Sequence, residues 1–349
     1  MFAVLSPPSS PLRFSVNLPL VIFSLLAMTT PTLSHSFGFD PAYGMDLAQL
    51  LAISPPEPPQ DFAAFWRSRY AVALALDTQP QIQATGQELG RHTVYDLRYR
   101  SMDGVEIGGW LLVPMDVPPV KGVLVGHGYG GRESPDALAG LDDAVLLFPC
   151  FRGMGLSPVA GLSDQPSLHV LYGIQERDRY VLGGCVDDLW LGVSALLALF
   201  PEVTGRVAVM GISFAGGIGA LAAPWDNRIG RLHIEVPSFG HQALRLTLPS
   251  VGSCEAVRDY QRQHRFNAME TLAYYDAASA ARHLAIPTLV AAAQFDPVVP
   301  PPGQFAIYNA IPEAWRKLFL LPAGHFDYSG KAAREQSLQE EVVRFLDAS

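Results

Sequence analysis

The amino-acid sequence predicts an α/β fold with a mostly parallel, doubly wound sheet that begins as an antiparallel hairpin. From Val120 onward, short apolar runs alternate with helical stretches, a pattern typical of parallel strands covered by helices on both faces. Before that point, two strand-like runs flank Asp103-Gly104, a dipeptide typical of a hairpin turn. With 349 residues, 49% of them hydrophobic, the chain can bury one large core.

The first 38 residues differ from the rest of the chain. Arg13, the mostly apolar run from Leu18 to Met28 and the small residues up to Ser34 loosely resemble a secretory signal. The apolar run is too short to span a bilayer. The alternative is a non-native extension upstream of the true start. In either case we expect residues 1–38 to be disordered and residues 39–349 to form a single domain.

The elements that follow can be taken in order. Residues 39–59 are rich in Pro and Gly, with a short apolar patch, and indicate an extended arm. Asp61 is the expected N-cap of an amphipathic helix that begins at Phe62. Strands are expected over Thr93–Tyr99 and Val105–Val113, which form the hairpin.

The alternating region supplies the remaining elements. Strands are expected at Gly122–Gly126, Ala144–Phe148, Arg206–Met210, Leu232–Val236, Thr288–Ala292 and Leu318–Leu321. Helices are expected at Arg179–Phe200, Phe214–Ala223 and Ala332–Leu346. On the first of these helices, adjacent Asp187 and Asp188 cannot both face one site, so we expect one structural partner and one solvated charge. Trp190 and Trp225 are expected in the core.

Charge and cysteine content narrow the class of protein. A net charge of -9, with no run of Lys or Arg, argues against nucleic acid or an anionic membrane surface as partner. Cys150, Cys185 and Cys254 are odd in number and widely spaced, so they fit neither a disulfide framework nor a metal site. We expect buried free thiols, no metal, no organic cofactor and no stable membrane span.

Residues 206–217 carry the first candidate for chemistry. An apolar strand breaks at Gly211, presents the hydroxyl of Ser213 and continues into small residues that can open a helix. This is the strand-turn-helix context of a nucleophile elbow, although its second glycine is replaced by Ala215. A serine between small residues is also a common turn or helix cap, so the elbow alone does not decide its role.

Residues at other strand ends support a catalytic role for Ser213, because active sites in parallel sheets lie at the carboxyl edge. A glycine-rich turn at residues 127–131 can aim a backbone N–H into a cleft. Asp296 and His325 each follow a predicted strand. Each has an ordinary reading as a turn or loop residue. Together, the order Ser213, Asp296, His325 is the order of the catalytic triad in α/β-hydrolases.

The chain resembles the acetyl xylan esterase / cephalosporin-C deacetylase family, carbohydrate esterases that remove acetyl groups from small oligosaccharides and from cephalosporins. The resemblance runs from about Phe39 to the C-terminus and implies an α/β-hydrolase fold. It rests on seven blocks, at residues 59–66, 127–129, 151–153, 211–217, 295–301, 305–309 and 324–325.

The resemblance implies a role for each site residue. Ser213 would be the nucleophile, His325 the general base and Asp296 its orienting acid. The backbone N–H groups of Tyr129 and Phe214 would form the oxyanion hole. The implied activity is that of a serine esterase on small acetylated carbohydrates or cephalosporin-like esters, without a cofactor.

Three positions depart from the family pattern. Met154 and Phe214 stand where the family usually has glutamine, and Phe326 stands where it usually has glutamate. All three changes make the neighbourhood more apolar. Arg152, Met154 and Phe326 are assigned to the substrate pocket or to its structural support, and for Arg152 we favour a structural ion pair.

Two alternatives stay open. One is a hydrolase of other acyl specificity, for longer esters or peptides, although too few residues lie between Phe39 and the oxyanion turn for the large propeller of prolyl oligopeptidases. The other is a catalytically silent binding protein with an apolar pocket lined by Phe214 and Phe326. The resemblance further implies a homo-oligomer, with a hexamer expected, and a cytoplasmic location. Export follows instead if residues 1–34 are a signal peptide.

Overall fold

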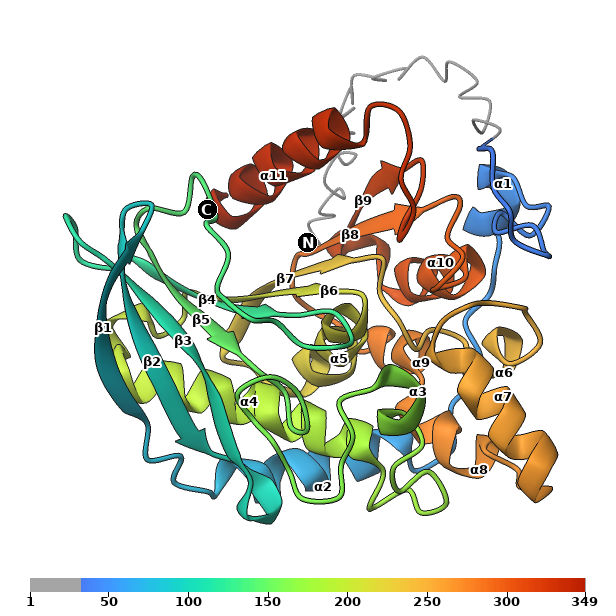
Figure 1. Ribbon diagram of the computed structural model, residues 1–349, viewed down its shortest axis with the longest axis horizontal. Helices are drawn as coiled ribbons and strands as arrows, with labels where there is room; N and C mark the ends of the chain where they lie inside the picture. The colour runs from blue at the N-terminus through green and yellow to red at the C-terminus, as the bar shows by residue number, and fades with distance from the viewer. Residues whose placement is uncertain (1–32, 349) are drawn as a thin grey trace, which may run out of the picture. The chain divides into compact units, whose positions relative to one another are not determined.

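A nine-stranded sheet organises the computed structural model, which describes residues 33–348 (Figure 1). The signal-like stretch expected at the N-terminus therefore lies almost entirely outside the described residues. Neighbouring strands follow the order β1 (Gln81–Leu89), β2 (His92–Arg100), β3 (Glu106–Pro114), β5 (Ala144–Pro149), β4 (Lys121–Gly126), β6 (Val207–Ile212), β7 (Ile229–Glu235), β8 (Thr288–Ala293) and β9 (Arg316–Leu321).

The pairing of the strands confirms the predicted fold class. β1, β2, β3 and β5 pair antiparallel in that order. Every pair from β5 through β4 to β9 is parallel. The hairpin predicted around Asp103-Gly104 joins β2 to β3, and both turn residues have a positive φ. Strand β1 was not predicted, because its side chains are polar and mostly exposed at the edge of the sheet.

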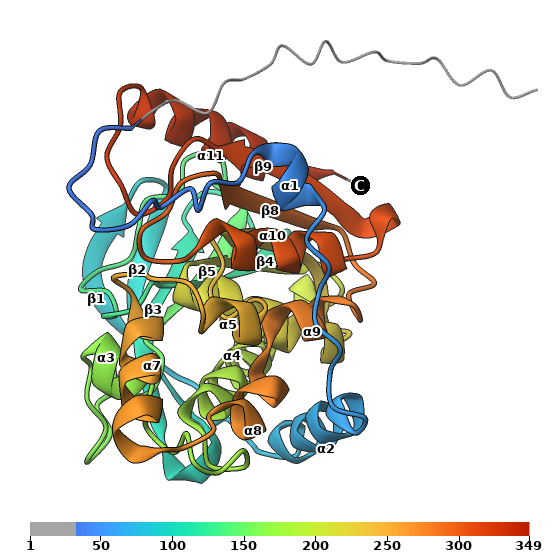
Figure 2. The same ribbon diagram turned by 90° about the vertical axis from the view of Figure 1, so that its right-hand side faces the viewer.

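The helices include the three that the pattern predicts, now seen as α4, α5 and α11. Within residues 33–348 the α-helices are α1 (Leu47–Leu51), α2 (Phe62–Leu74), α3 (Pro166–His169), α4 (Val181–Leu199), α5 (Phe214–Ala222), α6 (Gln242–Arg245), α7 (Ser253–His264), α8 (Met269–Leu272), α9 (Ala277–Ala281), α10 (Pro301–Ala310) and α11 (Lys331–Asp347). Figure 1 and Figure 2 show α11 on one side of the sheet and α4 and α2 on the other.

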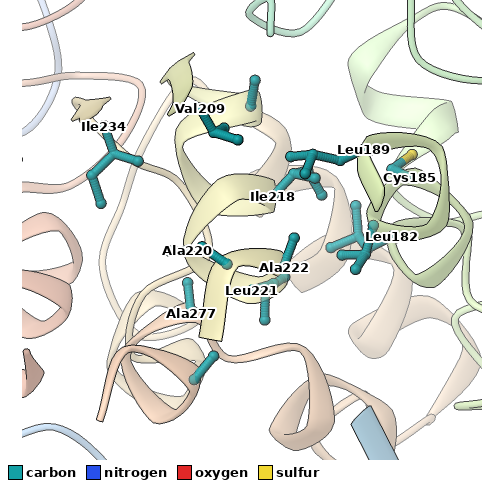
Figure 3. Packing of buried hydrophobic residues seen from close by; sticks show 14 of the residues in the cluster. Leu182, Cys185, Leu189, Val209, Ile218, Ala220, Leu221, Ala222, Ile234 and Ala277 are labelled. Carbon is teal, nitrogen blue, oxygen red and sulfur yellow. The ribbon is translucent and has the colours of Figure 1, made fainter. Parts of the chain in front are cut away.

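Two hydrophobic cores follow from the alternation of side chains along each strand. On β4, Leu124 belongs to the core with α2, α4, α5, α9 and α10, whereas Val123 belongs to the core under α11. Figure 3 shows the first core, in which Leu182 and Leu189 of α4 pack beside Ile218 of α5. Both faces of the parallel strands are therefore buried, which explains their nearly continuous apolar sequence.

Helix α4 lies deep in the first core. By length and composition it could cross a membrane, but 83% of its apolar window is buried within the fold. Asp187 and Asp188 are 1% and 0% exposed, and they pair with Arg69 and Arg152 at 2.7 and 2.8 Å. The prediction of a solvated charge on this helix was therefore wrong, because each carboxylate is buried against its own arginine.

Other local predictions have mixed outcomes. Asp61 precedes α2 but makes no capping hydrogen bond, because its carboxylate accepts hydrogen bonds from Tyr274 and Arg177 instead. The arm at residues 39–59 is not extended throughout, since it contains α1. All three cysteines are free and buried, and both Trp190 and Trp225 lie in the core, as predicted.

Residues 35–43, the N-terminal strap, lie against two loops at the carboxyl edge of the sheet. The ring of His35 is 5.4 Å from that of Phe295, and the ring of Phe37 is 6.0 Å from that of Phe326. Residues 35–38, which were expected to be disordered, therefore pack on the domain, because these aromatic side chains find apolar partners there.

Candidate active site

Ser213 occupies a sharp turn between β6 and α5. Its φ of 54° and ψ of -107° are rare for a residue with a side chain and carry backbone strain. The Ser213 N–H donates to the Glu235 carbonyl at 2.8 Å, and the Ser213 carbonyl accepts from the N–H groups of Gly217 and Ser238. Neighbouring backbone therefore holds the strained residue in place, as a nucleophile elbow requires.

The alanine in the elbow motif fits because another glycine makes room for it. A Cβ at Gly126 would lie 2.5 Å from the Cβ of Ala215, far closer than two carbons can approach. A Cβ at Gly211 would lie 2.4 Å from the Ala215 carbonyl oxygen. The missing glycine of the motif is thus compensated by Gly126 on the neighbouring strand β4.

The structure brings together the three residues predicted from the strand ends. Ser213 Oγ lies 2.9 Å from Nε2 of His325, and Nδ1 of His325 lies 2.8 Å from Oδ2 of Asp296. Because a carboxylate only accepts, Nδ1 carries the proton and Nε2 accepts from the serine hydroxyl. The three side chains form one continuous line of hydrogen bonds.

Asp296 is fully buried and has every lone pair direction occupied. Oδ1 accepts from the backbone N–H groups of Val298 and Val299, both at 2.9 Å. Oδ2 accepts from Nε2 of Gln304 at 3.0 Å as well as from His325. Gln304 is 0% exposed on α10, and no sequence motif marks it, so sequence reasoning missed this contact.

The surroundings of His325 favour its protonated form. Burial alone would lower the pKa of His325, but the hydrogen bond and the negative charge of Asp296 outweigh burial and raise it above 6.5. Glu235, whose own pKa burial raises to about 7, adds a smaller raising effect. The imidazole is therefore basic enough to accept a proton from Ser213.

The backbone N–H groups of Tyr129 and Phe214 were predicted to form the oxyanion hole. Tyr129 lines the same cavity as Ser213, and Phe214 is the next residue in the chain. Within residues 33–348, neither donates a hydrogen bond to another protein group. The turn that carries Tyr129 is tied to the elbow because the Ala215 N–H donates to the His127 carbonyl at 3.2 Å. This hydrogen bond holds the turn that carries Tyr129 against the start of α5, where Phe214 lies.

His127 holds this turn in place through two hydrogen bonds, a role that sequence reasoning missed. Its Nε2 accepts from the Phe151 N–H at 3.0 Å, and its Nδ1–H donates to the Gly128 carbonyl at 2.7 Å. Burial lowers the pKa of His127 to about 4, so the ring is neutral at physiological pH. Both ring nitrogens are used within the protein, and His127 is a structural support.

A cavity of about 740 Å³ lies over Ser213 and His325, between α3 and α7. Its wall includes Tyr129, Arg245 and Val299. The volume suits a small organic ligand. Within the part of the chain that the structure describes, no group of three or more His, Cys, Asp or Glu side chains is arranged to hold a metal ion.

The side chains of four predicted positions do not line this cavity. Phe214 is 0% exposed, with its ring 4.3 Å from that of Tyr129, and Phe326 packs on Phe295 at 5.0 Å. Met154 is buried in the core, and Arg152 is held by Asp188. These residues support the site and do not line it. The alternative of an apolar pocket lined by Phe214 and Phe326 is therefore wrong.

Solved structures with similar folds include acetyl xylan esterases and a peptidase. An acetyl xylan esterase from Paenibacillus sp. R4 has 23% sequence identity and a TM-score of 0.76, covering 86% of this chain and 99% of its own. Acetyl xylan esterase 1 from Thermoanaerobacterium sp. JW/SL YS485 has 21% identity and a TM-score of 0.73, covering 89% and 100%. At these identities the likeness shows an α/β-hydrolase fold.

A similar fold also makes up part of a longer peptidase chain. Acylaminoacyl peptidase from Pyrococcus horikoshii has 13% identity and a TM-score of 0.56, and the match covers 74% of this chain but only 42% of that one. The family evidence comes from sequence. The profile of the acetyl xylan esterase (AXE1) family matches residues 43–346, nearly all of the described chain. On the strength of that match, the chain is a carboxylic ester hydrolase and belongs to the acetyl xylan esterase family.

Proposed function

We propose that the enzyme removes acetyl groups from small acetylated carbohydrates through an acyl-enzyme formed on Ser213. The observation that carries the proposal is the line of hydrogen bonds from Ser213 through His325 to Asp296, which opens onto the cavity. Two structures with the same fold bear the name acetyl xylan esterase, which supports an acetylated sugar as substrate. Cephalosporin-like acetyl esters would react by the same chemistry.

Acylation begins when the Ser213 oxygen attacks the carbonyl carbon of the ester. His325 takes the hydroxyl proton on Nε2, while Asp296 holds its Nδ1–H and stabilises the imidazolium. The carbonyl oxygen becomes an oxyanion and accepts hydrogen bonds from the Tyr129 and Phe214 N–H groups. Each such donor contributes about 3 kcal/mol to the stability of the transition state.

The tetrahedral intermediate then breaks the bond to the sugar oxygen. His325 gives its proton to that oxygen, the alcohol leaves and acetyl-Ser213 remains. In the second half, His325 takes a proton from water as the water oxygen attacks the acetyl carbonyl. The bond to Ser213 breaks, the serine regains its proton from His325 and acetate departs. No cofactor takes part in this scheme.

Hydrolysis of p-nitrophenyl esters from acetate to octanoate tests the proposal, followed by release of acetate from acetylated xylo-oligosaccharides. We expect the wild type to prefer acetate and the Ser213→Ala variant to lose at least about a thousandfold in kcat. Ser279→Ala, a buried serine on α9 away from the cavity, is the matched control and should retain activity. Turnover that survives in Ser213→Ala would overturn the mechanism, and a preference for octanoate would overturn the acetyl specificity.

The quaternary state and the location stay predictions. The family resemblance predicts a homo-oligomer, with six copies expected, and multi-angle light scattering of the purified enzyme checks it. A mass of one 37.8 kDa chain would contradict the oligomer. Fractionation of the producing cells distinguishes a cytoplasmic enzyme from an exported one.

A further inference from the structure

Arg245 is a buried cation in the wall of the same cavity as Ser213. It is the last residue of α6 and is only 4% exposed. Its Nη1 donates to Gln242 Oε1 and its Nη2 to Ser253 Oγ, both at 3.1 Å. The guanidinium lies 5.3 Å from the centre of the Phe239 ring, and that ring packs 6.4 Å from Tyr129. The charge is thus held next to the proposed oxyanion turn.

The charge of Arg245 has no carboxylate partner among the described residues. No Asp or Glu oxygen of residues 33–348 lies within 4.0 Å of it, and its Nε makes no hydrogen bond. Arg152, comparably buried, holds Asp188 at 2.8 Å. A buried charge without a partner is costly, so such a residue is usually paired or reserved for a ligand.

The carboxylates that do line the cavity belong to its mouth. Glu255 and Asp259 project from α7, and each side chain is 43% exposed. Glu255 pairs with Arg258, and Asp259 pairs with Arg262. The acidic mouth is therefore neutralised by its own arginines, whereas the deeper Arg245 is bound only by neutral groups.

We propose that Arg245 binds a carboxylate on the substrate, so that the enzyme prefers acetyl esters whose alcohol part carries an acid group, such as acetylated acidic sugars. This inference rests on the proposed function and names its substrate class. A guanidinium binds a carboxylate through parallel N–H donors, and its neutral partners Gln242 and Ser253 keep it in place without cancelling its charge. An acetyl group is too small to carry the acid, so the anion lies on the leaving alcohol.

The test compares 4-acetoxybenzoate with 4-acetoxybenzamide, esters that differ mainly in the charge of the leaving group. For each enzyme the readout is the ratio of kcat/KM for the acid to that for the amide. Because both values come from one preparation, the ratio does not depend on how much protein is folded. The variants are Arg245→Gln, which removes the charge, and Arg245→Lys, which keeps it. Arg98→Gln removes one charge from an exposed pair on β2 and is the control.

We expect the wild type to favour the acid, and Arg245→Gln to lower the ratio by about tenfold or more, the size expected for a charged hydrogen bond. Arg245→Lys should keep part of the preference, and Arg98→Gln should leave the ratio within about twofold of the wild type. An unchanged ratio in Arg245→Gln overturns the inference. Equal losses on both esters also overturn it, because Arg245 would then support the fold or the oxyanion.

Failure of the proposed function would look different. If the wild type hydrolysed neither acetyl ester, the esterase proposal itself would be wrong, and the Arg245 inference would fall with it. If the wild type hydrolysed both esters with a ratio indifferent to Arg245, only the inference would be wrong.

Discussion

Gln304 donates a 3.0 Å hydrogen bond to Oδ2 of Asp296, the same carboxylate oxygen that binds His325. Its own Oε1 accepts from the Ala293 N–H at 2.8 Å, so the amide is fixed at both ends. The orientation of the acid is therefore set by helix α10 as well as by the loop after β8. Gln304 is a positioning residue, since it acts on the reaction only through Asp296.

Replacing Gln304 by Leu should weaken both activity and stability. The change leaves the buried Ala293 N–H without its partner and removes one of the four hydrogen bonds to Asp296, at a cost of about 1–3 kcal/mol in the free energy of unfolding. We expect kcat for p-nitrophenyl acetate to fall about tenfold with little change in KM. Urea unfolding and steady-state kinetics measure both effects. Gln336→Leu on the exposed face of α11 is the control, and equal effects of the two changes would refute the positioning role.

The pH dependence of activity should follow the raised pKa of His325. Only neutral His325 can accept the Ser213 proton, so kcat/KM rises with pH through this pKa, above 6.5. The contribution of His325 to the free energy of unfolding changes with pH in the opposite direction. It is fully present below the ordinary pKa, because the folded protein holds the proton more tightly, and it is lost as pH rises through the raised pKa. Parallel pH profiles of kcat/KM and of urea unfolding check both directions.

The variant Asp296→Asn separates the effect of burial on the pKa of His325 from the effect of Asp296. The negative charge disappears while the burial of His325 remains, so the pKa of His325 should fall and the acidic limb of the profile should move to lower pH. The asparagine also favours the wrong imidazole tautomer, and kcat should drop by roughly ten-thousandfold. An acidic limb that stays in place would show that Asp296 does not set this pKa.

The strain at Ser213 predicts a stabilising but inactivating change. Relief of a disfavoured backbone conformation is worth about 1–3 kcal/mol, whereas the extra flexibility of unfolded glycine costs about 0.5–1 kcal/mol. Ser213→Gly should therefore raise the free energy of unfolding by about 1 kcal/mol while turnover is lost. Ser279→Gly, within helix α9, should lower it by about 1 kcal/mol instead. A destabilised Ser213→Gly variant would argue that the turn is not strained.

The pair of Arg152 and Asp188 should be a major determinant of stability. Both side chains are buried, at 7% and 0% exposure, so Asp188→Ala leaves the buried Arg152 with only the exposed Asp103 as a charged partner and should cost about 3–5 kcal/mol. The exposed pair of Arg98 and Glu106 is the contrast, and Glu106→Ala should cost at most about 1 kcal/mol. Chemical unfolding of the two variants, side by side, decides whether burial governs the difference.

How much the sequence predicts depends on how local each signal is. Ser213, Asp296 and His325 could be found because each directly follows an apolar strand, and parallel strands deliver their carboxyl ends to one edge. Gln304 and Arg245 could not, because a glutamine or an arginine within a helix has many ordinary roles. Only the packing of α10 under the Asp296 loop, and of α6 against the cavity, gives them their contacts.

Three sequence predictions failed because the local pattern does not show which surfaces the fold buries. The polar edge strand β1 has no buried face, so its sequence lacks the alternation that marks a strand. One of Asp187 and Asp188 was expected to be solvated, but Arg69 and Arg152, both distant in the sequence, pair with the two carboxylates. Phe214 and Phe326 follow Ser213 and His325 in the sequence, which suggested that they line a pocket. The backbone instead turns both rings away into aromatic clusters.

The strap at residues 35–43 determines how far the polypeptide could be shortened from its N-terminal side without loss of contacts to the Asp296 loop. Its Pro41 carbonyl accepts a 3.1 Å hydrogen bond from the Asp296 N–H, and its Tyr43 hydroxyl donates to the Pro249 carbonyl. Proteolysis ahead of His35 would leave these contacts whole. A cut inside the strap would instead remove contacts to the loop that carries Asp296, so an intact strap and a correctly placed catalytic acid depend on each other.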